Sequence, residues 1–83
     1  MTGEIRYKSS VARDLKQIGP ADKQRVLGQI REVLATNPRG GEPLRGEFEG
    51  LFKLRVGDYR VIYALVGDYV LVLRIGRRSS VYG

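Results

Sequence analysis

The sequence has no cysteine and no histidine, and each absence excludes a class of protein. Without cysteine no disulfide can form, and without either residue there is no Cys/His cluster to hold a structural metal. The core must therefore come from aliphatic packing alone, and we expect neither a metal nor another cofactor. A chain of 83 residues is long enough for one domain, residues 1–83, and no more.

The sequence also lacks a long hydrophobic run. Residues 1–8 carry three charged side chains and lack the apolar stretch of a signal peptide, and no segment approaches the ~20 apolar residues of a membrane span. Together with the lack of cysteine, these absences predict a protein of the reducing cytoplasm that makes no contact with a membrane.

Basic residues are plentiful and unevenly placed. Fifteen lysines and arginines stand against nine aspartates and glutamates, which gives a net charge of +6. Residues 1–50 carry +2 of this charge, whereas residues 51–83 carry +4. A basic excess in the last third favours a polyanionic partner such as nucleic acid, although the same charge can simply keep a surface solvated.

The first part of the chain predicts a short strand and then a helix. Ile5 and Tyr7 alternate with polar residues, which is the pattern of a half-buried strand. Ser9 or Ser10 is expected to cap the helix that follows. We expect this helix to end at Gly19, whose missing Cβ permits the left-handed conformation of a helix C-cap.

A second helix is predicted to begin at Pro20, which suits a first turn because no backbone donor is needed there, and to end before Pro38. The glycine-rich segment 38–50 should be an irregular connection. The apolar stripes of the two helices are Val11, Leu15 and Ile18 in the first, and Val26, Leu27, Ile30, Val33 and Leu34 in the second.

From residue 51 the hydrophobic period changes to two, which is typical of strands, at 51–56, 59–66 and 69–76. A Gly-Asp dipeptide separates each pair of strands and predicts a hairpin turn. The sequence therefore indicates an α+β fold of order β-α-α-β-β-β. Its small, mainly antiparallel sheet should carry a two-helix hairpin on one face and leave the other face partly open.

The first hairpin predicts a cluster of basic side chains. A two-residue turn at positions 57 and 58 places Arg55 opposite Arg60, and Lys53 shares their face because side chains alternate along a strand. Directly opposed like charges are unfavourable, so one interpretation is that an anion binds between them. The other is that the arginines extend into solvent or pair with acidic residues of the preceding loop, namely Glu42, Glu47 and Glu49.

The sequence pattern allows two registers for the last strand. A two-residue loop at positions 67 and 68 would turn Arg74 into the core, which is costly. We therefore expect a three-residue loop or a β-bulge, which would turn Arg74 and Arg78 toward the basic cluster. The residues then predicted to lie under the helices are Leu71, Leu73 and Ile75.

Several stretches of the sequence resemble RelE toxins of bacterial and archaeal toxin–antitoxin pairs. They read GLFKLRVGDYRVIY over residues 50–63, VLRIGRR over 72–78 and SVY over 80–82. Two further matches are LRG at 44–46 and SVARDL at 10–15, so the resemblance covers essentially the whole chain. The GDYRVIY stretch and the GRRxxVY ending together are specific, and they imply a single RelE-like domain.

The resemblance implies an endoribonuclease that cleaves messenger RNA in the ribosomal A site. In RelE toxins the 2′-hydroxyl attacks the adjacent phosphodiester, leaving a 2′,3′-cyclic phosphate and a 5′-hydroxyl. By position, Tyr82 matches the tyrosine proposed as general base, and Arg78 the arginine proposed to protonate the leaving oxygen. Arg60 and Lys53 match residues that stabilise the developing charge. The RNA-binding residues are then expected to be Lys53, Arg45, Arg55, Arg74 and Arg77.

The lack of histidine agrees with such a site, because the acid–base pair of many ribonucleases is impossible here. A tyrosine with a free pKa of ~10 becomes a base only where nearby cations stabilise its phenolate. The sequence also departs from the family pattern. Some members have a second lysine where this chain has Leu51, and one cation fewer could slow the reaction.

The resemblance also implies partners and alternatives. The partners are a cognate antitoxin, the ribosome with its messenger, and operator DNA reached only through the antitoxin. A ParE-like toxin shares the fold but poisons DNA gyrase by binding alone, and it generally lacks the combination of Arg60 with Arg78 and Tyr82. A nucleic-acid-binding module without catalysis would explain the charge but not the C-terminal motif.

Overall fold

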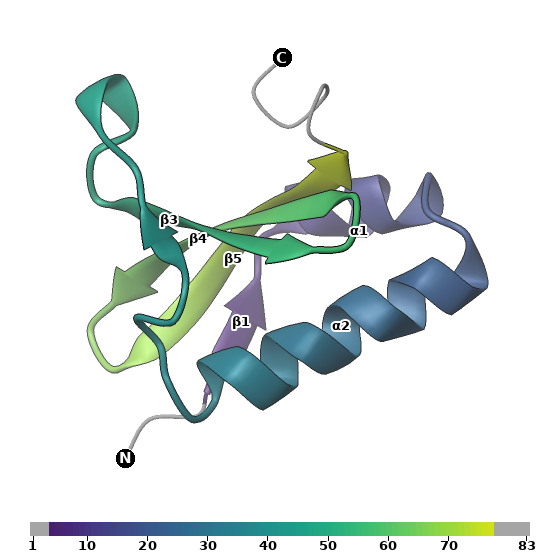
Figure 1. Cartoon of the computed structure of the whole chain (residues 1–83), viewed down its shortest axis with the longest axis horizontal. Coiled ribbons are helices and arrows are strands. Elements are labelled where there is room, and N and C mark those ends of the chain that lie inside the picture. The colour runs from purple at the N-terminus through teal and green to yellow at the C-terminus, as the bar shows by residue number, and fades with distance from the viewer. Residues whose placement is uncertain (1–3, 78–83) are drawn as a thin grey trace.

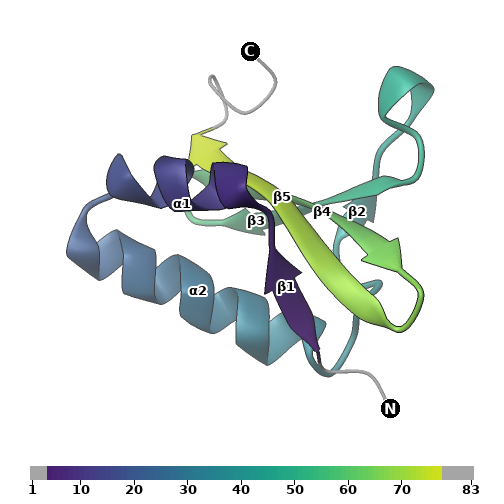
Figure 2. The same ribbon diagram turned by 180° about the vertical axis from the view of Figure 1, so that it is seen from behind.

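The chain folds into a five-stranded sheet with two helices on one side (Figures 1 and 2). The structure, a computed structural model, describes residues 4–77. Across the sheet the strand order is β1-β5-β4-β3-β2; β1 runs parallel to β5, and the other neighbours are antiparallel. The elements are β1 (Ile5–Tyr7), α1 (Ser9–Lys16), α2 (Pro20–Leu34), β2 (Glu42–Pro43), a 3-10 turn (Gly46–Phe48), β3 (Leu51–Val56), β4 (Tyr59–Val66) and β5 (Tyr69–Arg77).

The predicted α+β class and the order of its main elements are confirmed. β3 and β4 have the predicted bounds, and β5 extends one residue beyond its predicted end. One strand was not predicted: β2, two residues long, pairs with β3 inside the segment expected to be irregular. Within the described part of the chain, neither helix combines the length and the apolarity needed to cross a membrane.

The expected serine cap of α1 is wrong. The residue preceding the helix is Lys8, in an extended conformation, and no side chain caps the first turn. The hydroxyl of Ser10 instead donates a 2.9 Å hydrogen bond to the carbonyl of Leu73 in β5. This serine therefore fastens the helix to the sheet.

The expected left-handed cap at Gly19 is also wrong. α1 already ends at Lys16, and Gly19 has φ −61° and ψ 155° as the residue that precedes α2. The cause is Pro20, because a proline disfavours the helical conformation of the residue before it and favours an extended one. Pro20 begins α2 as predicted.

The last hairpin contains both a two-residue turn and a bulge. Val66 pairs with Tyr69 across the turn, and the regular register continues to the pair of Tyr63 with Val72. Ile62 then pairs with Arg74, which leaves Leu73 as the extra residue of a β-bulge. The predicted bulge is confirmed, and it lies in the strand instead of the loop.

The position of this bulge decides which side chains reach the core. Because the register shifts only after residue 72, Val70 and Val72 are buried, and Ile75 is buried beyond the bulge. Arg74 is thereby kept out of the core, as expected. The prediction that Leu71 and Leu73 lie under the helices is wrong, since both are only half-buried and neither belongs to the core cluster.

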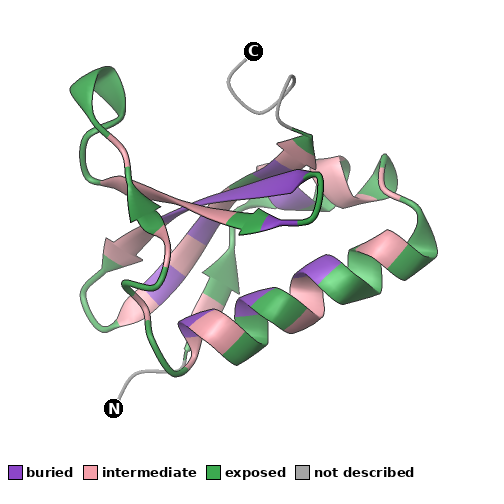
Figure 3. Ribbon diagram, viewed as in Figure 1, coloured by how far each residue is buried: buried purple, intermediate pink, exposed green. Residues whose placement is uncertain are grey.

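The core lies between the two helices and the sheet, and the buried positions of α2 are on the side turned toward the strands (Figure 3). Tyr63 is fully buried and stacks on Phe52, with 5.3 Å between ring centroids. Its hydroxyl donates to the carbonyl of Pro38 at 2.9 Å and accepts from the amide of Gly41 at 2.8 Å. Burial raises the pKa of Tyr63 above its ordinary value. These two bonds anchor the connection between α2 and β2.

Candidate functional site

The basic cluster lies on the face of the sheet that turns away from the core. The pairing predicted for the first hairpin is confirmed, with Arg55 opposite Arg60 and Leu54 opposite Val61. Val61 belongs to the core and Leu54 packs against it. Since side chains alternate along a strand, Lys53, Arg55 and Arg60 share the opposite face, which we call the open face.

Arg60 is the most buried charged residue among those described, with only 8% of its surface exposed. Its Nη1 donates a 3.4 Å hydrogen bond to the carbonyl of Tyr59. The ion pairs formed between residues 4 and 77 do not include Arg60, and its cross-strand neighbours are Arg55 and Gly76. A nearly buried guanidinium facing a second one, with no carboxylate among these partners, is an arrangement that an anion would stabilise.

Lys53 lies two residues before Arg55 on β3 and has an acidic neighbour. β2 places Glu42 directly opposite Lys53, with 3.7 Å between Nζ and Oε1. The lysine side chain is mostly covered, whereas that of Glu42 is 72% exposed. Glu42, one of the acidic partners considered from the sequence, therefore does form an ion pair in the structure. Its partner is Lys53, and not Arg55 or Arg60.

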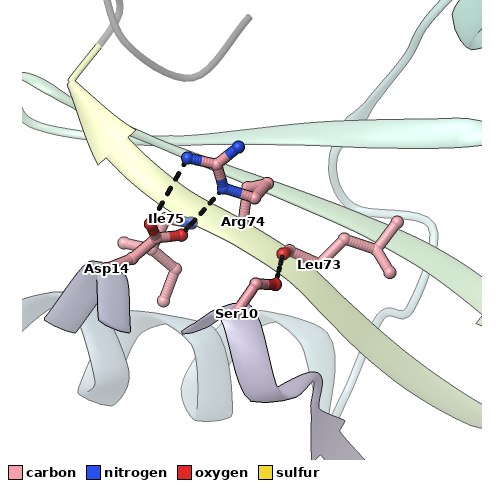
Figure 4. A network of polar contacts seen from close by, with 5 residues as sticks. All are labelled: Ser10, Asp14, Leu73, Arg74 and Ile75. Carbon is pink, nitrogen blue, oxygen red and sulfur yellow. Dashed lines mark hydrogen bonds and ion pairs between the residues drawn. The ribbon is translucent and has the colours of Figure 1, made fainter. Parts of the chain in front are cut away.

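Arg74 is held at the edge of the sheet by α1 (Figure 4). Its Nε donates to Oδ2 of Asp14 at 3.0 Å and its Nη2 to Oδ1 at 3.4 Å. The backbone amide of Ile75 also donates to Oδ2 of Asp14, at 3.0 Å. This carboxylate, 12% exposed, thus satisfies both a side chain and the strand beyond the bulge.

Arg77 and Arg45 lie apart from the open-face cluster. Arg77 pairs across the strands with Tyr59, a core residue, and its guanidinium carbon is 5.7 Å from the centroid of the Tyr59 ring. Arg77 therefore faces the helix side at the end of the sheet. Arg45 is exposed in the segment between β2 and β3, which projects from the sheet in Figure 1.

Two of the proposed catalytic residues, Arg78 and Tyr82, lie outside the described residues. The structure places the end of the strand that leads to them. β5 is described as far as Arg77, and Gly76 pairs with Arg60, so the last described residues lie beside the open-face arginines. The orientation predicted for Arg78 stays a prediction.

Asp14 is the contact residue that sequence reasoning missed. Carboxylates are unfavourable near the C-terminal end of a helix, because the helix dipole places negative charge there. Asp14 lies in the last turn of α1 together with Arg13 and Lys16. An acidic residue in that position was a signal of a tertiary partner, but the sequence does not show which residue that partner is.

This chain is similar to known toxins of toxin–antitoxin systems, both in sequence and in structure. A family model described as the ParE toxin of the type II toxin–antitoxin system parDE matches residues 5–82. Toxin RelE of Mycobacterium tuberculosis is 38% identical over 81 residues, covering 94% of this chain and 84% of the relative. Toxin RelG of the same organism is 33% identical over 85 residues, covering 94% and 93%. The crystal structure of the toxin–antitoxin complex RelBE2 of M. tuberculosis superposes with a TM-score of 0.86 at 30% identity, covering 96% of this chain and 95% of that one.

Proposed function

Because the chain belongs to the RelE/ParE family of type II toxin–antitoxin toxins, we propose that it is a ribosome-dependent endoribonuclease that cleaves messenger RNA in the ribosomal A site. The observation that carries the proposal is the nearly buried Arg60, opposed by Arg55 and without an ion pair among the described residues. Relatives named RelE support the nuclease over other toxins of the family. We also propose that residues 1–83 form a single domain and that the protein acts in the cytoplasm.

The proposed reaction is a transesterification within the messenger. The 2′-hydroxyl loses its proton to the Tyr82 phenolate and attacks the adjacent phosphorus, while the bond to the 5′-oxygen breaks and Arg78 protonates that oxygen. The products are a 2′,3′-cyclic phosphate and a 5′-hydroxyl. Negative charge grows on the phosphoryl oxygens during attack, and preorganised cations at that point stabilise the transition state most. Arg60 and Lys53 are the groups proposed for this role.

Two features of the open face suit a phosphate ligand. An anion between Arg55 and Arg60 would remove the repulsion between them. Glu42 contacts Lys53 across 3.7 Å and is largely exposed, so a phosphate oxygen can replace it at little cost. The remaining RNA contacts are proposed for Arg45, Arg74 and Arg77, which surround the cluster and do not enter it.

The test is to incubate the purified chain with ribosomes programmed with a defined messenger and to map the new ends. We expect cuts at the A-site codon, 5′-hydroxyl ends, and no comparable cleavage of the same messenger without ribosomes. Cleavage of free RNA at equal rates would contradict ribosome dependence. Intact messenger under all conditions would contradict the nuclease altogether.

The matching family model is described as a ParE toxin, and this favours a second candidate function. In that alternative the chain poisons DNA gyrase by binding and performs no chemistry. A gyrase supercoiling assay with the same preparation separates the two. Inhibited supercoiling with intact messenger would favour the ParE-like activity, whereas mapped cuts with normal supercoiling would favour the nuclease. Binding to RNA with neither effect would indicate a nucleic-acid-binding module.

A toxin of this family needs a partner that restrains it, and RelBE2 is a toxin–antitoxin complex. We propose a cognate antitoxin that covers or displaces the Tyr82 end, with operator DNA contacted only through that antitoxin. Beside the basic cluster, three apolar residues are paired across adjacent strands of the open face: Leu51, Ala64 and Leu71. They offer an apolar surface against which an antitoxin helix can pack. Deleting the antitoxin gene should arrest growth; unaffected growth would contradict toxicity.

A further inference from the structure

A second basic site lies outside the open face, between α1 and the end of β5. The groove there encloses about 290 Å³, close to the lower limit for small-ligand pockets. Its basic lining comes from Arg13 on α1 and from Arg74 and Arg77 on β5. Figure 4 shows one wall of it, where the last turn of α1 meets β5 at Asp14.

Basic side chains outnumber carboxylates among the residues that line this groove. Three guanidinium groups line it, and Asp14 is the one carboxylate among its lining residues. That carboxylate already accepts hydrogen bonds from Arg74 and from the amide of Ile75. Arg13 is exposed, and its side chain forms no ion pair with another of the described residues. Arg13 therefore brings to the groove a guanidinium that can turn toward a ligand.

The floor of the groove allows a ligand to approach the backbone of β5 closely. Tyr59 presents a ring against which Arg77 lies, and the Tyr59 hydroxyl is fixed by a 3.1 Å hydrogen bond to Asp22 of α2. Gly76, which has no side chain, also lines the groove. A ligand can thus reach the backbone of β5 between two arginines.

The groove and the open face meet around the end of the sheet. Gly76 and Arg77 of the groove pair with Arg60 and Tyr59 of β4, so neighbouring residues on one strand belong to the two sites. A strand of RNA that crosses the open face at Arg60 can continue past the end of β4 and β5 into the groove.

We propose that this groove binds a backbone phosphate of RNA, a phosphate other than the one cleaved, with Arg13 and Arg74 as its ligands. The inference rests on the proposed function for its choice of RNA as the ligand. Arginine suits phosphate because its planar group can donate two parallel hydrogen bonds, as Arg13 can here. Asp14 accepts from Nε and Nη2 of Arg74 and so fixes this guanidinium, whose Nη1 is the nitrogen left for the phosphate.

An acidic protein segment is the competing occupant, and the lining argues against it. Protein interfaces depend on an apolar centre that excludes water. Ile18 and Ile75 are the aliphatic residues among the nine that line the groove, whereas most of the others are charged or polar. Guanidinium groups around a small polar hollow fit a phosphodiester better than a helix.

The test compares Arg13→Gln with Lys16→Gln. Both residues are exposed in the last turn of α1, but only Arg13 lines the groove. The probe is a short single-stranded RNA with 2′-O-methyl groups, which cannot be cleaved, and binding is measured by fluorescence anisotropy over a range of salt concentrations. Arg13→Gln should weaken binding severalfold and lower the slope of log K against log salt by about 0.7, as expected for one lost phosphate contact. Lys16→Gln should change the slope much less.

Equal effects of the two variants would overturn the proposal, since the groove would then contribute only general charge. Loss of antitoxin binding by Arg13→Gln with unchanged RNA binding would also overturn it and assign the groove to a protein. The outcome is distinguishable from failure of the nuclease proposal. A selective Arg13 effect on RNA binding without ribosome-dependent cleavage would support the groove and refute the enzyme.

Discussion

Arg60 and Arg74 lie on adjacent strands of one sheet, yet their surroundings differ in every respect. Arg60 is almost buried and has no carboxylate partner among residues 4–77, whereas Arg74 is about half exposed and held by Asp14. Burying a charge without a counter-charge is costly, so such a residue is seldom kept for stability. The contrast favours Arg60 for the reacting phosphate, whereas Arg74 also has a structural role through Asp14 and lies outside the cluster where cleavage is proposed.

The largest expected effect is on catalysis at Arg60. Arg60→Met keeps much of the volume and removes the charge, so single-turnover cleavage on programmed ribosomes should fall roughly 10²-fold or more. Stability to urea should change little, because the lost charge has no ion pair within residues 4–77 and its removal relieves repulsion with Arg55. Arg25→Met is the control, since Arg25 lies on α2 in an exposed pair with Asp22. If both variants cleave equally well, Arg60 is not the cation that the reaction uses.

The next effect is on folding at Asp14. Asp14→Ala leaves the amide of Ile75 and the Nε of Arg74 without their acceptor, so unfolding in urea should require about 2 kcal/mol less free energy. Glu32→Ala on α2 removes an exposed carboxylate and should cost about 0.5 kcal/mol or less. Similar losses in the two variants would show that the pair at the sheet edge is not structural.

A smaller effect is expected where Tyr63 anchors the connection that carries Glu42. Tyr63→Phe leaves the amide of Gly41 without its acceptor, at a cost of about 1 kcal/mol. Because the folded-state pKa of Tyr63 is raised, its contribution is complete below its unfolded pKa of about 10 and is lost as pH rises through the folded value. The wild-type chain should therefore lose stability above about pH 10 more steeply than Tyr63→Phe. Parallel curves of stability against pH would contradict this origin.

The smallest effect concerns Glu42 and Lys53. Glu42→Gln removes the carboxylate beside the lysine, and since exposed ion pairs contribute little, stability should change by about 0.5 kcal/mol or less. Cleavage should become up to a few times faster, because Lys53 no longer has to exchange one anion for another. Glu47→Gln, in the same connection, should leave the rate unchanged. A slower Glu42→Gln enzyme would mean that the carboxylate positions the lysine.

Sequence was sufficient for the parts of the fold that local turns decide. The Gly-Asp turn at residues 57 and 58 sets the register of β3 and β4, and with it the neighbours Arg55 and Arg60. The position of the bulge at Leu73 was not predictable, because Ser10 and Asp14 hold β5 there from a helix more than 60 residues away in sequence. β2 likewise depends on a connection anchored by the buried Tyr63.

The same distinction applies to the candidate site. Lys53, Arg55 and Arg60 could be grouped from strand alternation alone. Arg77 could not be placed, because beyond the bulge its side depends on one inserted residue, and it lies with Tyr59 instead of Arg60. The Asp14–Arg74 pair joins α1 to β5, and no local pattern links residues so far apart.

The contacts of α1 with β5 also determine how this sheet can associate. A strand at the edge of a sheet offers free amides and carbonyls to any passing chain, and proteins block such edges to avoid aggregation. β1 pairs with β5 only over residues 70–72, and beyond it Ser10 occupies the carbonyl of Leu73 while Asp14 occupies the amide of Ile75. Two side chains of a helix thus replace a missing strand, and a second chain cannot extend the sheet at those positions.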